Sequence, residues 1–385
     1  MWSISNKNKF LIQRFIDAAS GFILSLFFIF GKRQKRIIFN STVNKDFTFN
    51  SKYLFINEKD NFEKAGYEVK FIINDFKRRE QLKEIYGDYF ISSKGLKQKK
   101  YILNASCWIM STMDAPITGL FMNHSRLVIQ LGHGTPIKNI GLMDQSASLL
   151  KKLYYRMMST NITYYLSPSE FFAEYIGKAF GVKQNQVLIA RQPRLDSMSS
   201  GKSEFIESFR KNKETKLILY TPTWRPYSDV KLFPFPDYNK ETLEKTLKEE
   251  NTVIFLRLHP KFEVNLSEYL NDNVINLDSS KAEDITEHLD QFDALLTDYS
   301  SIYCDFAMLN KPVGFVPYDL KEYEENVGFS HDYKELTWGG DIKKTSDIVK
   351  LSNIYTKKKV HVSTINKLNE NGAYSILTEL VKVSS

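Results

Sequence analysis

Short apolar runs alternate with helix-like stretches along most of this chain, and this alternation constrains its fold more than any other feature. In the first half, the runs typical of strands cover residues 36–41, 67–74, 101–105, 127–131, 164–167 and 187–190. Helix-like stretches lie between several of them, at residues 52–65, 77–86 and 169–180. Strands that alternate with helices predict a parallel sheet with helices on both of its faces.

A second series of the same kind follows a polar segment, residues 196–216. Its strands are expected at residues 217–220, 253–258, 274–277, 294–297 and 313–316, and its helices at residues 240–249 and 282–289. We therefore predict an α/β fold with two Rossmann-like, doubly wound domains, residues 37–200 and 201–362, and a ligand-binding cleft between them. Residues 1–36 precede these domains, and a last helix, residues 365–381, is expected in the C-terminal part, residues 363–385.

The composition is that of a globular protein. Of the 385 residues, 42% are hydrophobic and 25% are charged, which suffices for two domains with separate cores. The two cysteines, Cys107 and Cys304, lie far apart without the spacing of a disulfide framework or a metal site, so we expect a reducing cytosolic setting. The net charge of +8 favours anionic partners such as a nucleotide, a phosphate polymer or an anionic membrane surface. Nucleic acid is not expected, because no recognised module for it is found.

Residues 18–31 form an uncharged and largely apolar run near the amino terminus. Basic residues flank it: Lys7, Lys9, Arg14, Lys32, Arg33, Lys35 and Arg36. A helix that spans a bilayer needs about 20 apolar residues, so this run is short for that purpose. A basic, apolar helix instead suits the cytoplasmic face of the cell membrane, which predicts a peripheral membrane protein. The alternative is an ordinary core helix, but the phenylalanines of the run lie on more faces than one buried stripe covers.

Residues 293–309 predict a phosphate-binding turn. An apolar strand ends at Thr297 and Asp298, and Ser300 or Ser301 then begins a helix. Unpaired backbone N–H groups at the start of a helix, together with two serine hydroxyls, can hold a phosphate. Serine is also a common N-cap residue, so on this stretch alone a purely structural role for both serines stays open.

The strand at residues 127–131 leads directly into Gly132-His133-Gly134-Thr135-Pro136. Glycines on both sides let the backbone turn sharply and leave the imidazole uncovered. We expect Thr135 to cap a following helix, with Pro136 in its first turn. A histidine at a strand end suits a general base, since its unperturbed pKa lies near neutral pH. The alternative is a histidine that only makes a hydrogen bond within the turn.

The strand at residues 253–258 ends in a basic cluster of Arg257, His259 and Lys261. Polar groups at the carboxyl end of a parallel strand face the ligand-binding edge of the sheet. His259 and the cations beside it are therefore expected to bind a diphosphate and to stabilise the charge on a leaving phosphate. The alternative is a solvated strand end.

Two more strands end in polar motifs. Thr221, Thr223 and Arg225 follow the strand at residues 217–220, and we expect them at the mouth of the same cleft, with Trp224 in the core. Arg194 follows the strand at residues 187–190, where the alternative is a surface ion pair with its neighbour Asp196.

Four motifs thus occur in one order: Gly-His-Gly-Thr-Pro-x-Lys at residues 132–138, Thr-Pro-Thr-Trp-Arg at 221–225, Arg-x-His-Pro at 257–260 and Thr-Asp-Tyr-Ser-Ser-x-x-x-Asp-Phe at 297–306. Together they resemble the CDP-glycerol glycerophosphotransferase family, whose members are teichoic-acid and capsule enzymes. The resemblance extends over residues 36–333. It implies a GT-B fold with the acceptor on the first domain and the CDP-alditol mainly on the second, and a membrane-associated enzyme with a lipid-linked acceptor.

The resemblance also implies roles for single residues. It assigns the base to His133, a second essential histidine to His259, and pyrophosphate contacts to Ser300 and Ser301. Contacts with the diphosphate are further expected at Arg257, Thr297 and Asp298. Other substrate contacts are expected at Gly134, Thr135, Lys138, Arg194, Thr221, Thr223 and Arg225. The chain departs from the family pattern at Gly132, Arg191 and residues 338–340, which concerns the choice of alditol and acceptor.

The hypothesis is transfer of glycerol phosphate or ribitol phosphate from a CDP-alditol to a lipid-linked or polymer hydroxyl, with release of CMP. No Asp-x-Asp motif is found, so neither a metal nor a cofactor is expected. One alternative is a GT-B glycosyltransferase that uses a nucleotide sugar. Another is a membrane-bound scaffold that binds polymer without catalysis. The sequence leaves open the choice between glycerol and ribitol, between primase and polymerase, and whether the chain forms a homo-oligomer.

Overall fold

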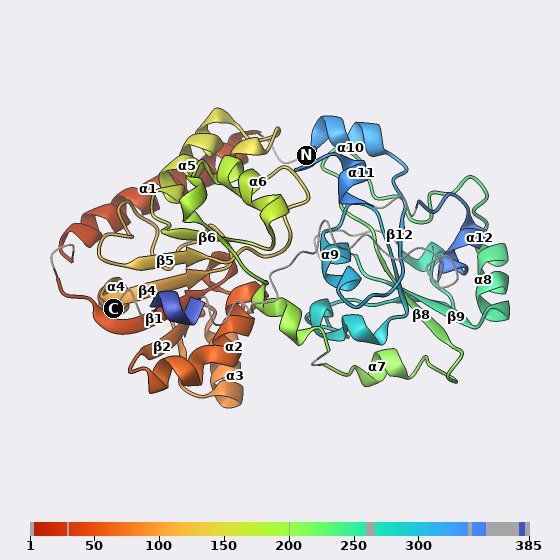
Figure 1. Cartoon of the computed structure of the whole chain (residues 1–385), viewed down its shortest axis with the longest axis horizontal. Helices are drawn as coiled ribbons and strands as arrows, with labels where there is room; N and C mark the ends of the chain where they lie inside the picture. Colours follow the sequence, from red (N-terminus) through yellow and green to blue (C-terminus); the bar gives the residue numbers. More distant parts are fainter. Residues whose placement is uncertain are drawn as a thin grey trace. The chain divides into compact units, whose positions relative to one another are not determined.

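The computed structural model describes residues 4–28, 31–199, 201–258, 266–337, 341–351 and 377–381, and only the backbone of residues 4–13. The chain folds into two compact units. The first comprises the residues up to Gly134, then Ile140–Arg194, and the described C-terminal residues 377–381; the second comprises Thr135–Asn139 and the chain from Leu195 onward. Each unit contains one sheet (Figure 1).

The sheet of the first unit has seven strands in the order β3-β2-β1-β4-β5-β6-β7. The strands are β1 (Gln34–Asn40), β2 (Glu68–Ile72), β3 (Phe90–Ile91), β4 (Ala105–Met110), β5 (Leu127–Gln130), β6 (Tyr164–Ser167) and β7 (Val187–Ile189). All neighbouring pairs are parallel. The strand order reverses between β1 and β4, and ligands bind at such a switch point in doubly wound sheets.

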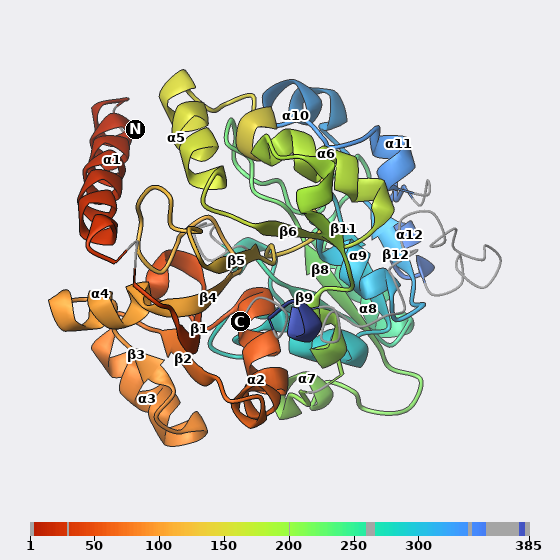
Figure 2. The same cartoon turned by 60° about the vertical axis from the view of Figure 1, so that its left-hand side comes forward.

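Helices cover both faces of this sheet (Figures 1 and 2). They are α1 (Ile4–Leu26), α2 (Phe49–Lys64), α3 (Phe76–Tyr86), α4 (Leu96–Leu103), α5 (Leu149–Ser159) and α6 (Glu170–Phe180). Successive side chains of a strand point to opposite faces, so Phe39 of β1 packs with α2 whereas Ile38 packs with α6. The described C-terminal residues join the α2 side, where Tyr67 Oη donates a 2.8 Å hydrogen bond to the carbonyl of Val381.

The second unit has a five-stranded parallel sheet in the order β10-β9-β8-β11-β12. Its strands are β8 (Lys216–Thr221), β9 (Thr252–Leu256), β10 (Val274–Asn276), β11 (Ala294–Thr297) and β12 (Val313–Phe315). Its helices are α7 (Glu204–Glu207), α8 (Lys240–Glu249), α9 (Ile302–Ala307), α10 (Leu320–Asn326), α11 (Tyr333–Leu336) and α12 (Thr345–Ile348). The switch point of this sheet lies between β8 and β11.

The secondary structure differs from the prediction at several places. The expected strand at residues 101–105 is the end of helix α4, and the strand is β4, which directly follows it. A short apolar run fits a buried helix as well as a strand, and the alternation of polar and apolar residues could not separate them. The expected helix at residues 282–289 is a 3₁₀ helix, Ile285–Gln291, which Asp284 caps by accepting a hydrogen bond from the Thr286 amide.

No helix follows Pro136, contrary to the prediction from Thr135 and Pro136. The segment Thr135–Asn139 is extended and pairs with residues of the second unit. The Asn139 amide donates to the carbonyl of Gly328, and the Ser330 amide donates to the carbonyl of Ile137, both at 3.0 Å. Proline fits extended backbone as well as a first helical turn, so these distant partners decide the conformation.

The apolar run near the amino terminus belongs to α1, which is helical over Ile4–Leu26. Among the described residues, no helix is both long and apolar enough to cross a membrane. Of the last predicted helix, residues 365–381, only residues 377–381 are described, and these are helical.

Candidate active site

His133 lies just beyond the carboxyl end of β5. The strand β5 is paired with β4, and β4 borders the switch point of the first sheet. Its neighbours Gly132 and Gly134 have φ angles of 72° and 155°. Residues with a side chain rarely adopt these values, so the two glycines are what allows the turn. The histidine itself is exposed to solvent, as the sequence predicts.

The imidazole of His133 is surrounded by groups of its own unit. It makes a hydrogen bond with the backbone of Ser111, and its ring centroid lies 5.4 Å from that of Phe49. Although the residue has exposed surface, the protein atoms around the imidazole exclude water from it, and this desolvation lowers its pKa below 6.5. The positive charge of Arg194 lowers the pKa further. The Ser111 bond and the charge of Asp114 act in the opposite direction. His133 is therefore neutral at neutral pH, the form that can accept a proton.

The sequence analysis missed Asn50, which holds the backbone of this loop. Asn50 is fully buried at the start of α2. Its Nδ2 donates to the carbonyls of Leu131 and Gly132 at 3.1 and 2.9 Å, and to Gln192 Oε1 at 3.1 Å. Its Oδ1 accepts from the amide of Arg194 at 3.2 Å. One amide side chain thus links the end of β5 to the loop after β7.

Arg194 completes the support of the loop. One of its Nη atoms donates to the carbonyl of His133 at 3.1 Å, and the side chain is buried, whereas Asp196 is exposed. Arg194 is therefore not a surface residue, as the alternative had assumed. Arg194 supports the backbone of His133, and its contact with substrate stays a prediction.

In the second unit, the motifs at residues 221–225 and 297–301 meet at the switch point. Thr221 ends β8 and Thr297 ends β11, and the two residues are paired in register. Their hydroxyls lie 3.0 Å apart, and Thr297 Oγ1 donates to the Thr221 carbonyl at 2.8 Å. Thr297 is fully buried, so in this structure its side chain joins the two strands.

Arg225 and Asp298 form the centre of a buried ion network. The Arg225 guanidinium, with 1% of its surface exposed, bonds Asp298 at 2.7 Å and both carboxylate oxygens of Asp319 at 2.8 Å. Asp298 also accepts from the amides of Thr223 and Tyr299. The network holds the turn after β11. The diphosphate contact of Asp298 and the substrate contact of Arg225 stay predictions.

Ser300 and Ser301 lie at the surface of that turn and are each partly exposed. Ser301 occupies the N-cap position of α9, but its side chain makes no capping hydrogen bond. Neither serine hydroxyl has a hydrogen-bond partner among the described residues, and the buried Thr223 hydroxyl nearby also lacks one. The interpretation that the serines only cap the helix is therefore not supported, and their hydroxyls are available to a ligand.

Lys138 approaches the same turn from the extended segment Thr135–Asn139. Burial lowers the pKa of its ammonium group to about 8, the charge of Asp298 acts to raise it, and that of Arg225 to lower it. Lys138 is thus close enough to Asp298 for the charges to interact, although 160 positions separate them in the sequence. Such a placement fits the prediction that Lys138 contacts the substrate.

The third motif is described only in part. Arg257 follows β9, and its guanidinium donates to the carbonyls of Leu277 at 3.1 Å and Glu283 at 3.3 Å, while burial lowers its pKa. His259 and Lys261 lie outside the described residues, so the predicted role of His259 stays a prediction. Trp224 is 43% exposed, so the expectation that it lies in the core is wrong. Its neighbour Arg225 is the buried residue at this point of the chain.

Comparison with known proteins identifies the class to which these motifs belong. The model of the family described as CDP-Glycerol:Poly(glycerophosphate) glycerophosphotransferase matches residues 22–371. The chain belongs to this family, and it is an enzyme of this kind.

The names of curated relatives refer to teichoic acid. A teichoic acid poly(glycerol phosphate) polymerase of Bacillus spizizenii is 28% identical over 335 residues, which cover 83% of each protein. A teichoic acid glycerol-phosphate primase of Bacillus subtilis is 29% identical over 264 residues, 66% of this chain and 67% of the primase.

Solved structures show the same fold. A variant of the wall teichoic acid polymerase TagF, soaked with CDPG, superposes with a TM-score of 0.71 at 20% identity and covers 98% of this chain and 96% of its own. A UDP-GlcNAc 2-epimerase of Neisseria meningitidis superposes with a TM-score of 0.54 at 12% identity, over 91% of this chain and 100% of its own. At these identities the likeness concerns the α/β fold with parallel sheets.

Proposed function

We propose that this chain transfers glycerol phosphate from CDP-glycerol, or ribitol phosphate from CDP-ribitol, to an acceptor hydroxyl in teichoic-acid synthesis. The observation that carries the proposal is the position of the motifs after the carboxyl ends of strands in the two sheets, in a chain of this family. One sheet presents a neutral histidine, and the other presents two serine hydroxyls that make no hydrogen bond to any described residue.

His133 acts as the base in this proposal. Its imidazole accepts the proton of the acceptor hydroxyl, and the oxygen attacks the phosphorus that bears the alditol. The bond from that phosphorus to the bridging oxygen breaks, and CMP leaves with this oxygen. The lowered pKa keeps the imidazole free of a proton before the reaction. Positioning and charge stabilisation supply most of the catalysis in phosphoryl transfer.

The donor diphosphate lies on the turn after β11. Ser300 and Ser301 donate their hydroxyls, and Lys138 supplies a positive charge near Asp298. We place Arg257 and His259 at the leaving phosphate. Transfer needs no metal in this proposal. Unchanged turnover in EDTA is expected, and loss of turnover that magnesium restores would contradict a metal-independent reaction.

The acceptor is lipid-linked or a polymer, and the enzyme works on the cytoplasmic face of the membrane. Helices α1 and α5 lie side by side (Figure 2), and the ring of Phe15 lies 5.6 Å from that of the buried Tyr154. The support is an exposed apolar surface on these two helices and the residues beside them. Its exposed side chains are Ile16, Ile23, Leu26, Phe27, Phe121, Leu149 and Leu153. Apolar side chains next to basic ones suit an anionic lipid surface.

Vesicle sedimentation tests this attachment. The chain is expected to sediment with phosphatidylglycerol vesicles more than with phosphatidylcholine vesicles, and the double variant Phe27→Ser, Leu149→Ser to sediment less. Phe76→Ser is the control, since Phe76 is equally exposed but lies on α3. Equal sedimentation of all three proteins would contradict the attachment surface.

The reaction is tested by incubating the chain with CDP-glycerol, CDP-ribitol or a UDP-sugar and identifying the nucleotide released. CMP is expected from one or both CDP-alditols. Release of UDP from a UDP-sugar would instead support the alternative, a glycosyltransferase. The UDP-GlcNAc 2-epimerase has a similar fold, so a UDP-sugar belongs among the substrates to be tried. Polymer binding without release of any nucleotide would support a scaffold.

A further inference from the structure

Helix α1 packs tightly onto the loop that follows β4. The closest approach is at Gly21, where a Cβ atom would lie 1.8 Å from the carbonyl oxygen of Thr118. Gly119 faces the same place, and a Cβ atom there would lie 3.1 Å from the carbonyl carbon of Gly21. Helix and loop therefore meet backbone to backbone, which leaves α1 a defined position on the first unit.

Arg14 joins α1 to the same loop by charge. Its guanidinium lies 3.1 Å from Asp114 Oδ1, and it also lies over the ring of Tyr154 at 5.6 Å from the centroid. Asp114 is the fourth residue after β4. The side chains of Arg14 and Asp114 are each about a quarter exposed. The pair is thus partly desolvated and fixed on one side by an aromatic ring.

Asp114 also connects to the loop after β1. Its second oxygen, Oδ2, accepts from the Val43 amide at 3.1 Å and from Thr112 Oγ1 at 3.3 Å. Val43 and Asn44 have φ angles of 54° and 57°, values that are costly for a β-branched residue such as valine. Such a strained turn persists only where its surroundings hold it, and Asp114 supplies one of the bonds that do so.

The loop after β4 reaches His133 through its first residue. Ser111 makes a backbone hydrogen bond with the imidazole, and its hydroxyl is bonded to the amide and the hydroxyl of Ser51 on α2. The charge of Asp114 acts on His133 as well. Residues 111–114 therefore carry both the hydrogen-bond partner of His133 and the carboxylate that binds Arg14.

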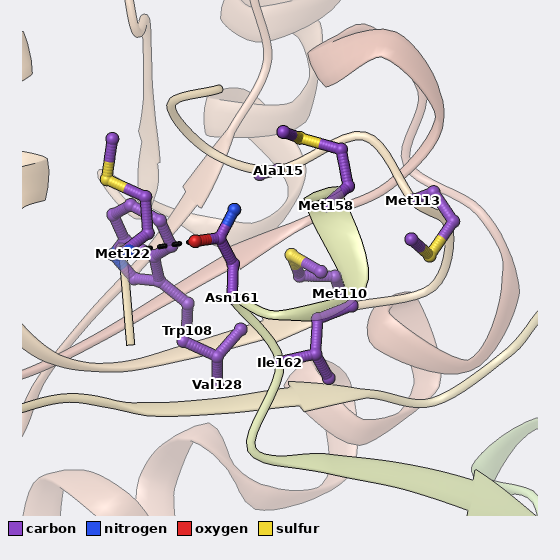
Figure 3. Close-up of a pocket in the computed structure, with 9 residues that line it drawn as sticks. All are labelled: Trp108, Met110, Met113, Ala115, Met122, Val128, Met158, Asn161 and Ile162. Atoms are coloured by element: carbon purple, nitrogen blue, oxygen red, sulfur yellow. Dashed lines mark hydrogen bonds between the residues drawn. The ribbon is translucent and has the colours of Figure 1, made fainter. Parts of the chain in front are cut away.

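Apolar packing beneath this loop is adaptable. A cavity of about 10 Å³, at the lower limit for one water molecule, lies beside it (Figure 3). Four of the lining side chains are methionines, Met110, Met113, Met122 and Met158, and methionine fills space in many conformations. The polar ties of the loop, rather than a close-fitting core, thus decide where residues 111–114 lie.

We propose that Arg14 of the N-terminal helix is a positioning residue for the catalytic base, acting through Asp114 on the loop that orients His133. The inference rests on the proposed function, because it needs His133 to be the base. It assigns α1 a role in the reaction besides attachment to a surface. An enzyme whose α1 is displaced would keep its donor site and lose the orientation of its base.

The test is the pH profile of kcat/KM for CMP release from CDP-glycerol with a lipid-linked glycerol-phosphate acceptor. Arg14→Gln leaves the Asp114 carboxylate without its cation and shifts the acid limb upward by about half a pH unit. Asp114→Asn removes the negative charge and shifts the limb downward by about the same amount. Both variants lower the plateau by about threefold to tenfold, and Arg14→Lys retains most of it.

The control is Arg156→Gln on α5, an exposed cation that makes no ion pair with Asp114 among the described residues, for which no shift is expected. Opposite shifts of the acid limb in Arg14→Gln and Asp114→Asn separate positioning from a merely structural role. Loss of packing would lower kcat/KM in both variants without moving their acid limbs in opposite directions. Shifts of the same sign, or none, with normal turnover of the unaltered chain, would overturn the inference alone. Absence of CMP release by the unaltered chain would contradict the proposed function first.

Discussion

The carboxyl edges of the two sheets hold their polar side chains by different means. Around His133, the supports are the Asn50 amide, the Ser111 hydroxyl and the Arg194 guanidinium, and the carboxylate whose charge acts on the imidazole, Asp114, has Arg14 beside it. Around the serine turn, the support is a buried guanidinium between two carboxylates. A base must stay neutral before it reacts, so neutral and cationic supports without a paired carboxylate suit it, whereas a diphosphate site needs a turn that does not move when a dianion arrives.

The charge of the second network follows from its members. One guanidinium against two carboxylates leaves a negative charge at the centre, and Lys138 offsets it. The network itself therefore does not attract a diphosphate. In this account the attraction comes from the serine hydroxyls, the backbone N–H groups of the turn and the cations of the third motif.

The largest effect is expected from His133→Ala. Loss of a general base lowers kcat/KM by about 10²- to 10⁴-fold. Binding of CDP-glycerol, measured by calorimetric titration, stays within about twofold, because the donor lies on the other sheet. His124→Ala is the control, since this exposed histidine belongs to none of the four motifs. Near-normal turnover of the His133 variant would remove the histidine from the mechanism.

Arg225→Met comes next and acts on stability. It leaves Asp298 and Asp319 buried without their cation, which costs about 3–5 kcal/mol in the free energy of unfolding. Urea unfolding measures the loss. Lys231→Met, which removes an exposed cation of the same unit, should change the stability by less than about 0.5 kcal/mol. Equal stability of the two variants would mean that the ion network does not hold the turn.

Asn50→Ala should lower both stability and turnover. It leaves the carbonyls of Leu131 and Gly132 without their side-chain donor and costs about 1–3 kcal/mol. The displaced loop also lowers kcat, while the KM for CDP-glycerol stays near its usual value. Asn61→Ala, at an exposed position of the same helix, is the control. A change in KM alone would indicate that Asn50 contacts the donor instead.

Ser300→Ala and Ser301→Ala separate ligand binding from capping. Each should raise the KM for CDP-glycerol by about fivefold or more, since a hydrogen bond to a charged group contributes about 1.5–3 kcal/mol. Stability should not change, because neither hydroxyl is bonded within the described chain. Ser203→Ala removes a true cap, whose hydroxyl accepts from the Ile206 amide, and should cost about 1 kcal/mol. If the Ser300 and Ser301 variants lose as much stability as Ser203→Ala and keep their KM for CDP-glycerol, the two serines only cap the helix.

The smallest effect concerns pH. Because the pKa of His133 lies below 6.5, kcat/KM should be constant near neutral pH and fall only as the pH drops through this lowered pKa. The charge of Arg194 contributes to the lowering, so Arg194→Gln should move the acid limb upward by about half a unit. An acid limb above pH 6.5 in the unaltered enzyme would contradict the environment described for His133.

Much of the fold could be predicted because parallel strands in doubly wound domains carry local signals. β5, β6 and β11 are continuous apolar runs, and polar motifs follow them at the edge where ligands bind. Thr221 and Asp298 were therefore expected at one edge, and the structure pairs their motifs.

What could not be predicted depends on distant partners. The segment after His133 is extended because Gly328 and Ser330 bond to it, nearly 200 positions further along the chain. Arg225 is buried because two carboxylates surround it, and the charged residue alone suggested a surface contact. Asn50 supports residues on two other loops, and its own neighbours in sequence carry no sign of that role.

The most direct measurement follows the phosphorus that bears the alditol. CDP-glycerol with radioactive phosphorus at that position is incubated with the chain and a lipid-linked glycerol-phosphate acceptor, and the acceptor and the nucleotide are separated. The account predicts that the label moves to the acceptor with glycerol still attached and that unlabelled CMP is released. Label that stays in a released nucleoside diphosphate, or in the unreacted donor when CDP-glycerol and CDP-ribitol are both tried, would contradict it.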